Sequence, residues 1–285
     1  MLKMVNNPIK PLAKIERARR VKALKHRVET AILMADAVYE NATMKVGHDA
    51  ILIKPDHKQM AIYIAIAGSN DTDDWRNNLA ADLARFGYHS GFFSSAHALH
   101  PQLDQELNKV LESTGYTSVI LTGHSRGGNL ALMVAEYLVL KAKTIPFHLE
   151  GVITLGAAKC MNNQGLDQWL AIMKHTVVVN IVNDGDLIPR LPSSLIGLLV
   201  TFRNIKRSWT WRRYQRNPNT VLVMASGLPI LEPSLKQWLC CLVLDAPFGR
   251  LCDHLMERYK DRLDWSLSMY DEDWELLLDR TLPNG

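Results

Sequence analysis

Hydrophobic residues along the chain alternate between strand-like runs and helix-like stripes. Short runs that are almost continuously apolar predict strands at residues 50–53, 59–67, 118–121, 151–155 and 176–182. Apolar residues spaced three and four apart predict helices at about 13–40, 74–86, 103–111, 130–141 and 253–259. Strands that alternate with helices in this way are typical of a mostly parallel sheet with helices packed on it, so we predict an α/β fold.

The length and composition of the chain fit a single globular unit. Hydrophobic residues make up 47% of the 285 residues and charged residues 22%, which allows a large core and excludes global disorder. The sequence has no internal repeat and no low-complexity linker. We therefore predict one domain over residues 1–285, with an irregular insertion at about 193–250.

One strand-to-helix corner carries a glycine-rich sequence with a serine at its centre. The strand at 118–121 runs into Thr122-Gly123-His124-Ser125-Arg126-Gly127-Gly128-Asn129, and the helix follows. A serine on so sharp a turn projects its hydroxyl clear of the sheet, and the glycines let neighbouring backbone approach. The helix N-terminus behind Ser125 favours a developing oxyanion. The pattern indicates a nucleophile; the alternative is a glycine-rich turn that happens to contain serine.

A nucleophilic serine needs a base and an acid. In α/β hydrolases these follow in the order serine, acid, histidine. Of the histidines after Ser125, only His254 also follows the loop that ends the strand at 176–182. His254 is therefore the predicted base by elimination, and its alternative role is that of a surface histidine at a helix start. Asp184 and Asp186 both lie in the loop, and both remain candidates for the acid.

Two backbone N–H groups are candidates for stabilising the oxyanion. One belongs to Arg126, directly after the nucleophile, and the other comes from the Gly68-Ser69 loop after the strand at 59–67. The helix predicted at 74–86 follows this loop. It is either a core helix or a mobile cover over an apolar pocket, and the apolar pattern fits both.

Five segments resemble motifs of the class 3 lipases, which are α/β hydrolases that include triacylglycerol lipases and related phospholipases. In the order of that family they are Asp74-Trp75-Arg76-Asn77-Asn78-Leu79 (D-W-x-x-D-L), His89-Ser90-Gly91-Phe92 (H-x-G-F), Gly123-His124-Ser125-Arg126-Gly127-Gly128 (G-H-S-L-G-G), Asp186-Leu187-Ile188-Pro189-Arg190-Leu191-Pro192 (D-x-V-P-R-L-P) and Asp253-His254-Leu255-Met256-Glu257-Arg258-Tyr259 (the terminal D-H region). The resemblance covers roughly residues 30–260. It implies an α/β-hydrolase fold with a mostly parallel central sheet flanked by helices.

The resemblance also implies roles for single residues. Asp186 opens the D-x-V-P motif, so it is the implied acid beside Ser125 and His254. Ser69 is the implied oxyanion donor that acts together with Arg126, and the helix at 74–86 falls where the family carries its lid. The implied activity is that of a serine carboxylic-ester hydrolase on lipid esters, acting through an acyl-enzyme without a metal or organic cofactor.

Three positions depart from the family pattern. Ala67 replaces the arginine of R-G-T/S, Asn78 replaces an aspartate, and Arg126 replaces the leucine after the nucleophile. None of these changes removes a group that does chemistry, because the oxyanion donors are backbone N–H groups. Arg126, with its charge beside the nucleophile, suggests a preference for an anionic head group.

Basic residues gather in two segments, at 14–27 on the first helix and at 203–216 among tryptophans. Each is either a solvated surface or a site of peripheral contact with an anionic membrane. A net charge of +4 is too mild to favour nucleic-acid binding. The alternative to an enzyme is a catalytically inactive hydrolase-fold module that binds membrane or protein.

The four cysteines, Cys160, Cys240, Cys241 and Cys252, match neither a zinc motif nor a disulfide framework. The N-terminal residues contain no apolar core typical of a signal peptide, and no apolar run is long enough for a membrane span. We therefore expect a cytoplasmic protein, or one that is exported without a cleaved signal peptide.

Overall fold

The computed structural model describes residues 11–68 and 87–183. It also describes the shorter stretches 186, 188–190, 215, 217, 220–223, 229–231, 256–260, 274–275 and 277–279. The predicted helix at 74–86 and nearly all of the basic segment 203–216 lie outside these residues.

A single sheet forms the centre of the described part, and its eight strands lie in the order in which they occur in the chain. They are β1 Met44–Val46, β2 Asp49–Asp56, β3 Ala61–Ile66, β4 Ser118–His124, β5 His148–Leu155, β6 Val177–Asn183, β7 Thr220–Val223 and β8 Pro229–Leu231. Strands β3 to β7 run parallel, while β1, β2 and β8 are antiparallel to their neighbours. The five predicted strands are confirmed, and the stretch expected to be irregular at 193–250 contains two short strands, β7 and β8.

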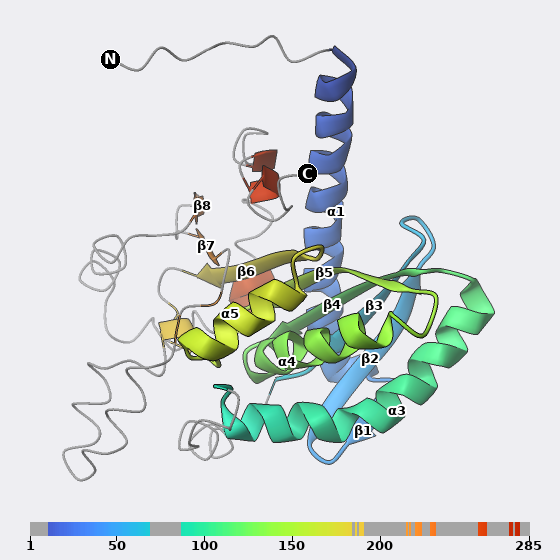
Figure 1. The fold of residues 1–285 in the computed structure, drawn as a ribbon, viewed down its shortest axis with the longest axis vertical. Coiled ribbons are helices and arrows are strands. Elements are labelled where there is room, and N and C mark those ends of the chain that lie inside the picture. The colour runs from blue at the N-terminus through green and yellow to red at the C-terminus, as the bar shows by residue number, and fades with distance from the viewer. Residues whose placement is uncertain are drawn as a thin grey trace, which may run out of the picture.

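The helices lie on both faces of this sheet (Figure 1). Helices α3 Ser90–Thr114, α4 Arg126–Lys141 and α5 Asn163–Ile172 connect successive parallel strands and share one face. They share it because each crossover is right-handed and the strand order always advances in the same direction. Helix α1 Pro11–Asn41 packs on the other face, together with residues 256–260, 274–275 and 277–279.

Alternating residues of the central strands supply the two cores. In β3, Ile62, Ile64 and Ile66 pack under α3 and α4, while Ala61 and Tyr63 face α1. All six residues of β3 are buried. A strand covered on both faces reads as a continuous apolar run, which is why this part of the sheet was predictable.

Helix α3 begins inside the segment that resembles H-x-G-F. His89 is its N-cap, and the imidazole accepts a hydrogen bond from the Phe92 N–H. The helix ends at Gly115, which has a φ of 67° and donates its N–H to the Leu111 carbonyl, as the glycine at this point predicted.

The basic first half of α1 pairs with acidic groups of the same chain. Arg17 donates to Glu275 at 3.0 Å and to Asp279 at 2.5 Å, and Lys25 lies 5.9 Å from the centre of the Trp274 ring. Part of the basic surface predicted at 14–27 therefore faces the C-terminal segment. Among the helices described, none combines the length and the apolarity needed to cross a bilayer.

The packing of α1 on the sheet can be tested within the helix itself. Leu24 is 1% exposed, and Leu33 is 50% exposed. Leu24→Ala should lower the free energy of unfolding by about 2–5 kcal/mol because it leaves a cavity under α1. Leu33→Ala should change it by less than about 0.5 kcal/mol. Urea denaturation of both variants measures the difference, and equal losses would contradict the docking of α1.

Candidate active site

Ser125 occupies the corner between β4 and α4 in a strained conformation. Its φ is 58° and its ψ is −126°, and among the described residues other than glycine only Met60 also has a positive φ. Such angles persist only where the surroundings enforce them, and they concentrate at functional turns. The Ser125 N–H donates to the Leu155 carbonyl at the end of β5, at 2.8 Å, which fixes the corner against the neighbouring strand.

The glycines around the corner are required by close backbone contacts. A Cβ on Gly123 would overlap the backbone of Gly127, and a Cβ on Gly127 would overlap the carbonyl of Ile66 and the backbone of Ala67. The first turn of α4 therefore lies directly against the end of β3. This confirms the prediction that these glycines admit neighbouring backbone.

The structure places the Asp186 carboxylate beside the end of β5. The carboxylate is fully buried and accepts hydrogen bonds from the Ile188 N–H at 2.8 Å and from the Tyr259 hydroxyl at 2.6 Å. Its Oδ2 lies so close to Gly156 that a Cβ there would be 2.9 Å away. Gly156 directly follows Leu155, whose carbonyl accepts the Ser125 N–H, so Ser125 and Asp186 contact adjacent residues at the end of β5.

Three of the predicted site residues, His254, Ser69 and the alternative acid Asp184, lie outside the described residues. The segment that follows His254 reaches the site nevertheless, because residues 256–260 are helical and include Tyr259. The Tyr259 ring lies edge-on to His124, with ring centres 5.5 Å apart. Residues 256–260 are thus beside the corner between β4 and α4 at Ser125, which we call the elbow.

Tyr39, at the end of α1, is a residue of the site that sequence reasoning missed. Its hydroxyl accepts a hydrogen bond from the Gly68 N–H at 3.1 Å and hydrogen-bonds to His124 Nδ1 at 3.1 Å. Burial raises the pKa of the Tyr39 hydroxyl, so it is protonated at neutral pH. In the sequence Tyr39 appears only as one member of an apolar helical stripe, which gives no sign of these contacts.

The Arg126 side chain is buried and paired with other residues of the chain. Its guanidinium forms a two-pronged ion pair with the buried Asp49 carboxylate and donates to the Ser95 hydroxyl at 3.0 Å. The suggestion that Arg126 reaches an anionic head group is therefore wrong, because Asp49 already takes the charge. Of the groups of Arg126, the backbone N–H remains a candidate donor to the oxyanion, and the side chain does not.

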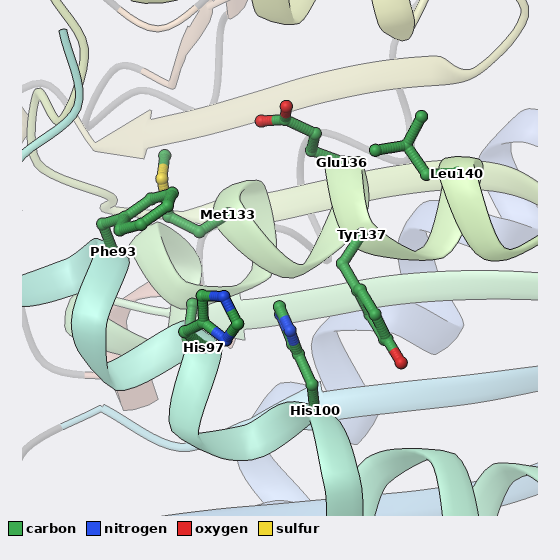
Figure 2. A pocket seen from close by; sticks show the side chains of 8 residues that line it. Phe93, His97, His100, Met133, Glu136, Tyr137 and Leu140 are labelled. Carbon is green, nitrogen blue, oxygen red and sulfur yellow. The ribbon is translucent and has the colours of Figure 1, made fainter. Parts of the chain in front are cut away.

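A separate pocket of about 150 Å³ lies between α3 and α4. Its lining residues are Phe93, Ala96, His97, His100, Met133, Glu136, Tyr137 and Leu140 (Figure 2). Met133, the residue of this group nearest to Ser125 along α4, is eight positions away, about 12 Å at 1.5 Å per residue. In the part of the chain that the structure describes, no group of three His, Cys, Asp or Glu side chains is suited to a metal ion.

His100 is held in its neutral form in this pocket. Its ring stacks on that of Tyr137 (Figure 2). The ring centres are 3.7 Å apart and the planes are 7° apart. Burial, followed by the positive charge of neighbouring His97, lowers the pKa of His100 to about 4.

Comparison with known proteins points to the same part of the chain. A sequence model of the family described as Lipase (class 3) matches residues 63–195. Phospholipase A1 PLIP2, a chloroplastic protein of Arabidopsis thaliana, is 28% identical over 136 residues. That match covers 45% of this chain and spans only 19% of the length of the relative.

Solved lipase structures share the fold. The Rhizomucor miehei triacylglyceride lipase has a TM-score of 0.60 at 16% identity, over 82% of this chain and 93% of that one. A triacylglycerol lipase whose catalytic centre is described as a serine protease triad has a TM-score of 0.57 at 16% identity, over 87% of this chain and 94% of that one. At these identities the likeness concerns the fold, and it confirms the predicted α/β-hydrolase architecture.

The contact between α4 and β3 predicts unequal effects for two glycine substitutions. Gly127→Ala should lower the free energy of unfolding by about 1–3 kcal/mol, because the methyl group meets rigid backbone. Gly151→Ala, whose Cβ would have its nearest neighbour at 3.6 Å, should change it by less than about 1 kcal/mol. Thermal denaturation compares the two, and a harmless Gly127→Ala would show that the close approach is no constraint.

The neutral state of His100 predicts a dependence of stability on pH. The unfolded chain binds a proton at His100 near pH 6.5, whereas the folded chain does so only near pH 4. The contribution of His100 to stability is therefore complete above pH 6.5 and is lost as the pH falls from 6.5 to about 4. Unfolding free energies measured in urea between pH 7.5 and 4 should fall less steeply for His100→Gln than for the wild type. Identical slopes would contradict the shift.

Proposed function

Because residues 63–195 belong to the class 3 lipase family, we propose that the chain is a serine carboxylic-ester hydrolase acting on lipid esters. The observation that carries the proposal is the strained conformation of Ser125, with a φ of 58°, at the corner between β4 and α4. A buried carboxylate, that of Asp186, lies beside Gly156, the residue after the one whose carbonyl accepts the Ser125 N–H. A positive φ at a serine is costly, and a catalytic role for the hydroxyl gives that cost a reason.

In the proposed reaction the Ser125 hydroxyl attacks the acyl carbonyl. His254 takes the proton from the serine and delivers it to the alcohol leaving group, and Asp186 orients the imidazole. The backbone N–H groups of Arg126 and Ser69 stabilise the oxyanion, and water then releases the acyl group from Ser125.

The surroundings of Asp186 are compatible with this role. The Ile188 N–H and the Tyr259 hydroxyl both donate to its carboxylate, which fixes the orientation of the side chain. Tyr259, which donates to Asp186, follows His254 by five residues in the sequence, and this supports the choice of His254 as the base.

The proposed substrate class is a lipid ester, and two subclasses follow from the relatives. One relative is a phospholipase A1 and another is a triacylglyceride lipase. The purified chain should be offered triglyceride, zwitterionic phospholipid and anionic phospholipid, with the products resolved by mass. Release of free fatty acid from any of these supports the substrate class, and release from none of them contradicts it.

The nucleophile can be tested with a matched pair of serine variants. Ser125→Ala should lower kcat on a chromogenic short-chain ester by about four orders of magnitude, because the attacking atom is gone. Ser94→Ala, at an exposed position on α3, should retain the activity. A fluorophosphonate probe should label the wild type and Ser94→Ala but not Ser125→Ala. Equal rates for the wild type and Ser125→Ala would sink the mechanism.

A further inference from the structure

A buried ion pair fastens the first residue of α4 to the outer strand β2. Arg126 Nη1 and Nη2 bond to the two carboxylate oxygens of Asp49, with Nη2 at 3.2 Å from Oδ2. Nη2 also donates to the Ser95 hydroxyl of α3. The two charged side chains are only 10% and 8% exposed. The pair therefore joins three elements, α4, β2 and α3, at one point.

This geometry is directional as well as attractive. A guanidinium that meets a carboxylate with two parallel bonds has a fixed orientation, unlike a single ion contact. Burial lowers the pKa of Arg126, which shows that the charge is unfavourable there without compensation. Each partner therefore depends on the other, and removing one leaves an uncompensated buried charge.

The ion pair crosses the end of β3. Strand β2 runs antiparallel to β3, with Ile51 opposite Ile66, so Asp49 lies at the same end of the sheet as the elbow. β3 lies between β2 and β4, and its end continues through Ala67 and Gly68 to Ser69. Arg126 thus reaches from the elbow, past the strand that leads to Ser69, to the strand beyond it.

The opposite face of the same loop has its own attachment. There the Tyr39 hydroxyl of α1 binds both the Gly68 N–H and the His124 imidazole. The start of the loop after β3 therefore lies between two contacts with the elbow, one through Tyr39 and one through Arg126 and Asp49.

We propose that the ion pair between Arg126 and Asp49 positions Ser125 and the backbone N–H of Arg126 against the end of β3. The catalytic meaning of this role rests on the proposed function, whereas the fastening of the elbow does not. Asp49 is a positioning residue, since its carboxylate acts through the Arg126 side chain. The ion pair departs from the motif that the elbow resembles, which has leucine in place of Arg126, and leucine forms no ion pair.

The central variant is Asp49→Asn, which keeps the shape and removes the charge. Its matched control is Glu150→Gln. Glu150 lies on β5, away from the elbow, and forms an ion pair with Arg27 of α1 that this variant removes. At temperatures well below unfolding, Asp49→Asn should lower kcat on a short-chain ester by about 10-fold or more, with KM changed by less than about 2-fold. Glu150→Gln should leave kcat unchanged.

A double variant separates positioning from stability. Asp49→Asn combined with Arg126→Leu removes the unpaired buried charge, so the midpoint of unfolding should recover toward the wild type. kcat should stay low, because the link between α4 and β2 is still missing. A double variant that regains both the midpoint and kcat would show that the pair is only structural, and would overturn the proposal. This variant also keeps the proposal testable if Asp49→Asn alone does not fold.

Hydrogen exchange gives a readout that needs no activity. Amides in peptides covering Gly68 and residues 125–129 should exchange about 10-fold faster in Asp49→Asn than in the wild type, and at the wild-type rate in Glu150→Gln. Faster exchange in a chain that hydrolyses no ester, with Ser125 unlabelled by fluorophosphonate, would refute the proposed function and leave the fastening role standing. Unchanged exchange together with unchanged kcat in folded Asp49→Asn would overturn the inference itself.

Discussion

The contact between Gly127 and the end of β3 is the constraint on which the site depends. The Ile66 carbonyl and the Ala67 backbone lie so close to Gly127 that no side chain fits between them. Backbone against backbone is a stiff contact, because it has no rotamers that can adjust. The distance from the elbow to the end of β3 is therefore set by main chain.

Side chains from distant parts of the chain then fix the orientation of this contact. Tyr39 comes from α1, Asp49 from β2 and Tyr259 from the C-terminal part, and each has a bond to the elbow or to Asp186. Both tyrosine hydroxyls accept a backbone N–H and hydrogen-bond to a further side chain, His124 for Tyr39 and Asp186 for Tyr259. Each hydroxyl is thus held by two partners.

The elbow was predictable from sequence because its causes are local. A β-branched run, two glycines four residues apart and a helical stripe all lie within residues 118–141, and the structure has β4 and α4 there. The short strands β1, β7 and β8 are too brief to leave a pattern, and α5 was missed for the same reason. The partner of Arg126 lies 77 residues away, so no local pattern indicates that its charge is taken by Asp49.

The course of α1 bears on how a lipid would approach. Arg27 pairs with Glu150 in the first half of β5, whereas Tyr39 contacts Gly68 and the elbow at the C-terminal end of β3 and β4. Tyr39 lies twelve positions after Arg27, which is about 18 Å along the helix. The basic half of α1 and Ser125 therefore lie toward opposite ends of the sheet. Arg17, Arg20 and Arg27 also pair with carboxylates of the chain, which reduces the field they present. A bilayer held by this half of α1 would lie away from Ser125, so under the proposed function a lipid ester would reach the serine from the elbow end of the sheet.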